Sequence, residues 1–393
     1  MSLDFQQIRH QVQQLGENAP MLERQRQTLR EKAHELLEAN AHELEPLRQK
    51  VDFVARKYDN RLRCALPGSE PLNVSVPLPE LSQEATLIAA DGSQINLDRH
   101  AEVQYCLVNV GAIQMRTGSP EAPVTKVECQ LLYGTDLYTR TGLITDAALA
   151  LLRDLNERKM LAELAQGAEP PVITFTDGQM ELWLPKSGDS PDSDTQGERL
   201  EEYIQALKQL CQLDVITAGY VDKPGARLVV RLLELASLVE SELAEIKERY
   251  PLQGLTDRDI YLKILEPGER SAVFAIHSPS AAVYRDEIAL HFFYLNIGRA
   301  GLARVEVPAW VAGSSEKLDG LHAALVEQCR IMGPRPYPYL LHRAHEVAVV
   351  SIQEKEQVTQ MIAQELYQHG VPVGERSYKQ SAKDLPGKGR VAG

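Results

Sequence analysis

Cysteine is scarce in this 393-residue chain, and its cysteines are not grouped along the sequence. Their number is odd, and no two of them form a CxxC pair. These features argue against a zinc knuckle and against a disulfide framework. We therefore expect a reducing, cytoplasmic compartment. The five are Cys64, Cys106, Cys129, Cys211 and Cys329.

Long apolar runs and several familiar motifs are also missing. No apolar run approaches the roughly 20 residues that cross a membrane, and the polar N-terminal stretch is unlike a secretory signal. The sequence contains no GxGxxG, GxxxxGKS/T or GxSxG pattern. Their absence argues against a dinucleotide fold, a P-loop ATPase and a hydrolase elbow. His345-Glu346 begins like the zinc-protease motif HExxH, but Val349 stands where the second His is required.

Positive charge is in deficit, because 42 Lys and Arg face 55 Asp and Glu, for a net charge of −13. This balance argues against a protein that coats nucleic acid through bulk electrostatics. It is compatible with an enzyme that has a local basic channel beside an acidic metal site. Residues 376–393 are basic and include Lys379. This tail is either a solvated chain end or a nucleic-acid contact.

The pattern of apolar residues divides the chain into three parts. Residues 1–66 are expected to be helical, because one apolar stripe with helical spacing indicates a helical hairpin. The hairpin either packs on the core or serves in dimerisation or partner docking. Residues 67–84 contain several prolines and read as a linker, and residues 85–393 as one domain. The stripe comprises Leu29, Leu36, Leu44, Leu47, Val51 and Val54.

Within the third part, strand-like and helix-like segments alternate. Three strand-like runs from residue 85 predict an antiparallel meander, and residues 146–166 are strongly helical. PPVITFTDGQMELW predicts a strand, a turn and a second short strand, so the core is a mixed α/β sheet. The remaining expectations are a loop at 186–196, a helix near 197–213, a strand ending near Asp222, a long helix from Leu228, three strands that include a hairpin, and two closing helices.

Two acidic residues follow apolar strands. Asp91 follows LIAA and Asp177 follows VITFT, and a glycine comes after each. A fixed carboxylate at a strand end is a suitable ligand for a divalent metal. Asp-Gly is also a common hairpin turn, so each position has a plain structural alternative. The helix between them carries Asp154, Glu157 and Glu163, although most charged residues on such a helix are solvated.

Three further positions are candidates for chemistry. His345 lies on an amphipathic helix, where a packed or capping His is the more common case. In GYVDKPGAR, Tyr220, Lys223 and Arg227 follow a strand. They suit phosphate contacts or form an ordinary polar loop.

Several segments, in this order, resemble the NurA nuclease family. The resemblance implies a ribonuclease-H-like mixed sheet core with added helices and a DNA nuclease that uses manganese or magnesium. It also implies a homodimer that works beside a hexameric ATPase, HerA, in DNA end processing. The segments are AADGSQI at Asp91, FTDGQMELW at Asp177, TAGYVDKPGARLVVRLL at Tyr220, FFYLNIG with ARVEVPAW at Arg304, and YPYLLHRAHEVAVVS at His345.

The resemblance also implies roles for individual residues. Asp91 and Asp177 resemble the two strand carboxylates of the family, and Glu157 resembles its helix carboxylate, with Glu163 as the rival. His345 resembles a late ligand or proton-handling residue, and Tyr220 an active-site tyrosine. Phosphate contacts are expected from Lys223, Arg304 and Lys379. Gln179-Met180 departs from the family pattern, in which a smaller residue and Leu are expected.

The resemblance thus implies a metal-dependent DNA nuclease, a 5′ to 3′ exonuclease with endonuclease activity in addition. Three carboxylates and an imidazole suit two divalent ions, and the imidazole favours manganese. Two other functions fit the same residues. One is a catalytically inactive partner of the ATPase, and the other is a ribonuclease-H-like enzyme that acts on RNA.

Overall fold

The computed structural model describes residues 4–80, 84–101, 103–139, 142–182 and 193–371. The chain divides into two compact units. The first unit comprises Met1–Gln83, Gly178–Glu181 and Ala218–Pro338. The second unit comprises Glu84–Asp177, Leu182–Thr217 and Tyr339–Gly393. The three-part division expected from the sequence stays a prediction.

The sheet of the second unit has the strand order β7-β2-β3-β4. Strands β2, β3 and β4 form the predicted antiparallel meander. β7 returns parallel to β2, with Ala90 beside Thr176. Three antiparallel strands, a helix and then a strand parallel to the first make a ribonuclease-H-like topology. The bounds are β2 Thr86–Ile95, β3 Tyr105–Arg116, β4 Val124–Tyr133 and β7 Val172–Asp177, with a small pair β5 Tyr138–Thr139 and β6 Gly142–Leu143.

Helix α3 (Asp146–Gln166) has the bounds that the sequence predicts. Thr145 caps it by accepting a hydrogen bond from the backbone N–H of Ala148, which satisfies a donor at the helix start. α4 (Ser193–Gln212) follows and packs against α3. α3 lies against β2 and β7, and α4 packs on α3.

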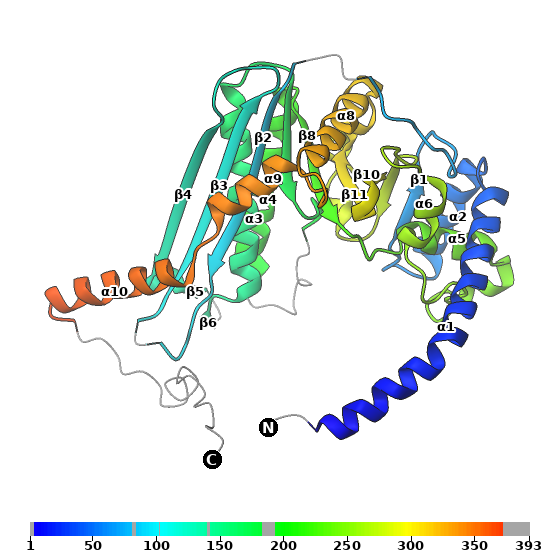
Figure 1. Ribbon diagram of the computed structural model, residues 1–393, viewed down its shortest axis with the longest axis horizontal. Coiled ribbons are helices and arrows are strands. Elements are labelled where there is room, and N and C mark those ends of the chain that lie inside the picture. The colour runs from blue at the N-terminus through cyan, green and yellow to red at the C-terminus, as the bar shows by residue number, and fades with distance from the viewer. Residues whose placement is uncertain (1–3, 81–83, 102, 140–141, 183–192, 372–393) are drawn as a thin grey trace. The chain divides into compact units, whose positions relative to one another are not determined.

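Helix α9 (Tyr339–Ala348) crosses β2 and β3, and Figure 1 shows it running over these strands. Its close approach depends on Gly111 in β3, where a Cβ would lie 2.7 Å from the backbone nitrogen of Ala348. α10 (Ile352–Gln368) follows, and its Val358 and Ile362 pack near Leu107 at the start of β3.

The first unit contains a sheet in which every recorded pair is antiparallel. Its strand order is β1-β9-β10-β11-β8. The predicted hairpin is confirmed, because β10 and β11 pair along their length. β1 was not expected, since residues 1–66 read as helical. The bounds are β1 Cys64–Pro67, β8 Ile216–Asp222, β9 Phe274–His277, β10 Leu290–Asn296 and β11 Leu302–Pro308.

The first unit also contains the expected pair of N-terminal helices, α1 (Phe5–Ala39) and α2 (Leu44–Lys57). The apolar stripe is buried in part, at Leu47, Val51 and Val54. The other helices of this unit are α5 Leu228–Ser237, α6 Asp257–Ile264, α7 Ala309–Ala312 and α8 Ser315–Ile331. Short 3-10 turns are η1 Gly134–Leu137 in the second unit, and η2 Glu240–Glu245, η3 Ala281–Val283, η4 Asp286–Ile288 and η5 Gly298–Ala300 in the first.

Three expected elements differ in the structure. The long helix from Leu228 ends at Ser237, and a 3-10 turn follows it. The last helix is two helices, because Ser351 starts α10 anew by accepting from the N–H of Glu354. The short strand expected after Asp177 does not form in residues 178–182. No described helix is long and apolar enough to span a membrane.

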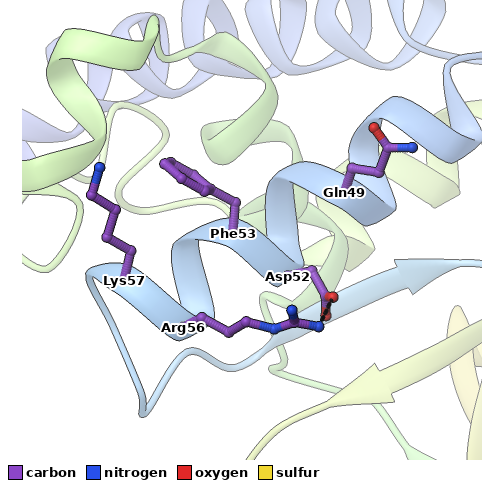
Figure 2. A pocket seen from close by; sticks show the side chains of 5 residues that line it. All are labelled: Gln49, Asp52, Phe53, Arg56 and Lys57. Carbon is purple, nitrogen blue, oxygen red and sulfur yellow. Dashed lines mark hydrogen bonds and ion pairs between the residues drawn. The ribbon is translucent and has the colours of Figure 1, made fainter.

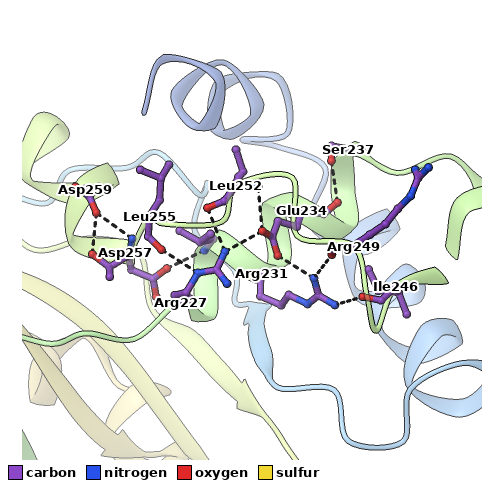
Figure 3. Close-up of polar contacts among 12 residues, drawn as sticks. Arg227, Arg231, Glu234, Ser237, Ile246, Arg249, Leu252, Leu255, Asp257 and Asp259 are labelled. Carbon is purple, nitrogen blue, oxygen red and sulfur yellow. Dashed lines mark hydrogen bonds and ion pairs between the residues drawn. The ribbon is translucent and has the colours of Figure 1, made fainter. Parts of the chain in front are cut away.

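A buried polar network surrounds α5 in the first unit (Figure 3). Asp257 accepts hydrogen bonds from the backbone N–H groups of Leu228, Val229 and Val230 at the helix start. Glu234, fully buried, accepts from both Arg227 and Arg231. Arg227 also binds two backbone carbonyls. The structure thus favours a structural role for Arg227 over a phosphate contact.

Candidate functional site

Asp91 lies inside a strand rather than at a turn, which corrects the sequence-based expectation. β2 continues through Asp91 and Gly92 to Ile95, with Asp91 beside Gly111 and Gly92 beside Val110 on β3. The Asp-Gly pair therefore forms no hairpin. Because side chains alternate along a strand, Asp91 and Gly92 face opposite sides of the sheet.

A glycine is instead required at position 92 because two side chains of α3 come very close to β2 there. A Cβ at this position would lie 2.5 Å from Cγ of Arg153 and 2.6 Å from Oε1 of Glu157. Both of these side chains belong to α3. The missing side chain thus lets the Glu157 carboxylate come up against β2 next to Asp91.

Asp177 occupies the predicted position at the end of β7. Gly178 follows with a φ of +91°, a conformation that favours glycine, so this turn is confirmed. Asp91 and Asp177 each come one residue after the paired Ala90 and Thr176. Neighbouring strands lie about 4.8 Å apart, and equivalent residues point to the same face. The two aspartates therefore share one level and one face of the sheet.

His345 reaches the site from α9. Its Nδ1 atom lies 2.6 Å from Oδ2 of Asp91. The His345 side chain is 62% exposed and that of Asp91 13%, so the imidazole is on the solvent side of the contact. The end of α9 is held in place by Ser93 and Asn109, whose side chains both donate to the backbone oxygen of Ala348.

Glu157 is buried on α3, whereas its rival Glu163 is exposed and pairs with Lys126. Burial raises the pKa of Glu157 well above its usual value, and the negative charges of Asp154 and Asp91 raise it further. The adjacent Arg153 opposes this shift. The structure therefore places Glu157, and not Glu163, within electrostatic reach of Asp91.

Arg158 is a buried residue of α3 that supports the end of β7. Its guanidinium donates to the hydroxyls of Thr176, Thr217 and Tyr203 at 2.9 to 3.2 Å. Thr176 directly precedes Asp177 in the chain. Arg158 departs from the expectation that charged residues on this helix are solvated, because Thr176, Thr217 and Tyr203, which bind it, come from distant segments.

The donor set fits a divalent cation chemically. Carboxylate oxygens are the ligands that magnesium and manganese prefer, and a cation would offset the buried negative charge of Glu157 beside Asp91. Among the described residues, no three His, Cys, Asp or Glu side chains converge closely enough to form a ligand group. The residues therefore fit a divalent cation by the type of their ligand atoms and by their positions in the fold.

Two other sequence-predicted site residues lie in the interior of the first unit. Tyr220 is fully buried, with its hydroxyl 4.0 Å from Sγ of Cys329 and its ring against Tyr337. Burial raises the pKa of Tyr220. Arg304 is also buried and forms a 2.7 Å ion pair with Glu306. Neither side chain is presented to solvent, so neither suits contact with substrate.

The last two predicted phosphate contacts have different outcomes. Lys223 is exposed in the first unit and lies 3.7 Å from a carboxylate oxygen of Asp222. Lys379 falls outside the described residues. Contact of either residue with DNA stays a prediction.

A shallow hollow beside α2 offers no comparable chemistry (Figure 2). It is lined by residues of that helix, where Asp52 and Arg56 pair with each other. Lys57 lies 5.0 Å from the ring centre of Phe53. The charged side chains of this hollow therefore already interact with neighbouring side chains of α2.

The ribonuclease-H-like core and the match to a NurA domain together support a nuclease, a hydrolase that acts on nucleic acids. The NurA domain profile matches residues 85–350, more than half of the chain. The chain belongs to the NurA family.

One solved structure agrees with this assignment at the level of the fold, and two others are similar over parts of the chain. The NurA nuclease from Sulfolobus solfataricus is similar with a TM-score of 0.50 and 12% identity, over 82% of this chain and 92% of that one. The catalytic domain of human endonuclease V matches with a TM-score of 0.31 and 12% identity, over 81% and 98%. LC9-RNase H1 matches with a TM-score of 0.24 and 18% identity, over 57% and 99%. Comparison with curated protein sequences gave no match.

Proposed function

We propose that this protein is a metal-dependent DNA nuclease whose active site is formed by Asp91, Glu157, Asp177 and His345. The observation that carries the proposal is the arrangement around β2. His345 contacts Asp91 on one face of the strand, and Glu157 approaches Gly92 on the other. Asp177 lies at the same level on the adjacent β7.

These four residues would hold one or two manganese or magnesium ions. When bound, such ions supply an activated water and stabilise the oxygen that leaves the phosphorus. Asp91 contacts His345 and lies within electrostatic reach of Glu157, so it would be the central carboxylate of the site. With a cation bound, the buried Glu157 carboxylate would be charged, and water would screen this charge little.

His345 has a second function in this proposal. With Nδ1 directed at Asp91, its other ring nitrogen, Nε2, is left to bind a ligand or to take up a proton. The imidazole is largely exposed, so substrate can reach it. Which nitrogen carries the proton follows from the partner of Nδ1.

The finer features of the function are proposed from the family resemblance. We infer DNA as the substrate, cleavage in the 5′ to 3′ direction, and endonuclease activity in addition. We also infer a homodimer that works with a HerA-type hexameric ATPase in DNA end processing. Lys223, exposed at the end of β8, is available to contact a phosphate.

Cleavage of labelled linear DNA with Mn²⁺ tests the site. Asp91→Ala and Asp177→Ala are expected to abolish cleavage, while Glu163→Ala, an exposed acid on the same helix as Glu157, keeps it. Wild-type rates in both aspartate variants would contradict the assignment. If the wild-type protein neither cleaves nor binds Mn²⁺ in calorimetry, the inactive-partner function is correct instead.

Two further comparisons test the substrate and the direction. Equal amounts of DNA, RNA and hybrid duplex are offered in competition, and preferential loss of RNA would overturn the choice of DNA. End-specific labels then distinguish the direction. A ladder of products that shortens from the 3′ end would contradict 5′ to 3′ cleavage.

A further inference from the structure

The N-terminal half of α1 is a long helix without a packing partner among the described residues of this chain. Every residue from Asp4 to Thr28 is exposed, and the first buried residue of α1 is Ala33. The exposed part nevertheless carries large apolar side chains, with Phe5 63%, Val12 60% and Leu15 68% exposed. A helix that remained in water would be expected to be polar on all sides.

These apolar residues follow a heptad repeat. The spacings between successive members alternate between three and four residues. Such a 3.5-residue period forms a narrow seam that fits a second helix in a coiled coil. In heptad notation, positions a are Phe5, Val12 and Ala19, and positions d are Ile8, Leu15 and Leu22.

The seam ends where α1 is attached to its own unit. The next position a is Arg26, whose guanidinium donates to Asp259 at 2.9 Å. Arg30, one turn further on, also donates to Asp259. The helix is thus anchored from Arg26 onward and leaves three heptads available to a partner.

The composition of the seam favours a second copy of this chain, aligned in parallel. The central layers have Val12 at position a and Leu15 at position d, a combination typical of two-stranded parallel coiled coils. In a parallel pair, Asp4 at position g lies beside position e of the second copy, which is Arg9. The charges are opposite, and the two-fold symmetry repeats the contact. An antiparallel alignment brings no such pair together.

The two helix-weakening residues of this segment are outside the seam. Pro20 lacks a backbone N–H, and its ring is directed towards the carbonyl four residues earlier. That earlier residue is Gly16, which has no side chain to crowd the ring. They occupy heptad positions b and e, so any bend at Pro20 leaves the a and d residues continuous.

We propose that residues 5–22 of α1 form a parallel two-stranded coiled coil with the same segment of a second copy. The coiled coil would be the contact surface of the homodimer included in the proposed function. Its formation does not depend on the nuclease chemistry. The NurA match begins at residue 85, so α1 lies outside the matched residues.

Light scattering on the full-length protein during size-exclusion chromatography tests the proposal. The wild type is expected to be a dimer, and Val12→Asp/Leu15→Asp a monomer with an unchanged melting temperature, because both side chains are exposed. Gln13→Asp/Gln14→Asp adds the same charge at positions b and c and is expected to remain dimeric. A monomeric wild type, or a dimeric Val12→Asp/Leu15→Asp variant, would overturn the proposal.

Cross-linking tests the orientation. In a Cys129→Ser background, which removes an exposed thiol, Ile8→Cys is expected to form a disulfide with its own counterpart upon oxidation. The antiparallel alignment places Ile8 opposite Ala19 instead, too far from its counterpart for a disulfide. A failure of Ile8→Cys to cross-link would overturn the parallel arrangement. DNA cleavage by these variants is measured separately, so failure of the coiled coil and failure of the nuclease assignment are distinguishable.

Discussion

Nδ1 of His345 lies 2.6 Å from Oδ2 of Asp91, although 254 positions separate the two residues in the sequence. The contact joins α9 to the first strand of the ribonuclease-H-like core. It is possible because Gly111 lets α9 lie directly on β3 and because Ser93 and Asn109 bind the end of the helix. The proposed site is therefore assembled from both ends of the second unit.

Replacing His345 by Ala is expected to lower the rate of DNA cleavage by about 10²-fold or more, the usual contribution of a group that positions or transfers a proton. The melting temperature should stay the same, because the side chain is mostly exposed. His342→Ala is the matched control on the same helix, where His342 pairs with Glu346. Equal rates for both variants would contradict a role for His345.

Gly92→Ala is expected to reduce cleavage strongly, because the new methyl group would displace the Glu157 carboxylate and the Arg153 side chain. Such overpacking typically costs about 1–3 kcal/mol of stability, which denaturant unfolding measures. Gly197→Ala in α4 is the control, since no heavy atom lies within 4 Å of its added Cβ. It should be neutral or slightly stabilising. Full cleavage by Gly92→Ala would show that the close approach is unimportant.

Glu157→Gln is expected to change activity and stability in opposite directions. The substitution keeps the size of the side chain but removes a charge that is buried beside Asp91 and Asp154. We expect unfolding at neutral pH to cost about 1 kcal/mol more and cleavage to be lost, since burial of an uncompensated charge is unfavourable. Glu163→Gln should change neither quantity. A destabilised but active Glu157→Gln protein would contradict this account.

Arg304→Ala tests whether Arg304 stabilises the fold or contacts phosphate. Removing one member of a buried ion pair leaves Glu306 charged without its partner, which typically costs about 3–5 kcal/mol. Glu306 also accepts from the backbone N–H of Met180, three residues after Asp177. Lys223→Ala should leave stability unchanged and weaken DNA binding instead. If the Arg304→Ala protein were stable and bound DNA more weakly, the hypothesis that Arg304 contacts phosphate would be supported instead.

Elements defined by local patterns were predicted well from the sequence. The bounds of α3, the meander, the hairpin of β10 with β11, and the turn at Gly178 all follow from periodicity, capping and turn residues. Each of these signals lies within a short stretch of chain. The Asp-Gly pair at Asp91 gave the same local signal as the pair at Asp177, yet it does not turn.

The difference between the two Asp-Gly pairs comes from distant partners. Beyond Asp91, β2 is paired with β3 up to Leu107, whereas β7 ends at Asp177. Burial of Tyr220 and Arg304 depends on similar distant contacts, with Cys329 and with Glu306. A tyrosine or arginine after an apolar strand gives no sign of which face it occupies until the neighbouring strands are known.

The most direct test of the central claim is anomalous diffraction from crystals soaked in Mn²⁺. A manganese peak is expected in contact with the Asp91 carboxylate, near Glu157, Asp177 and His345, and it should be lost in Asp91→Ala crystals. A protein that cleaves DNA but binds manganese away from Asp91, or not at all, would contradict it.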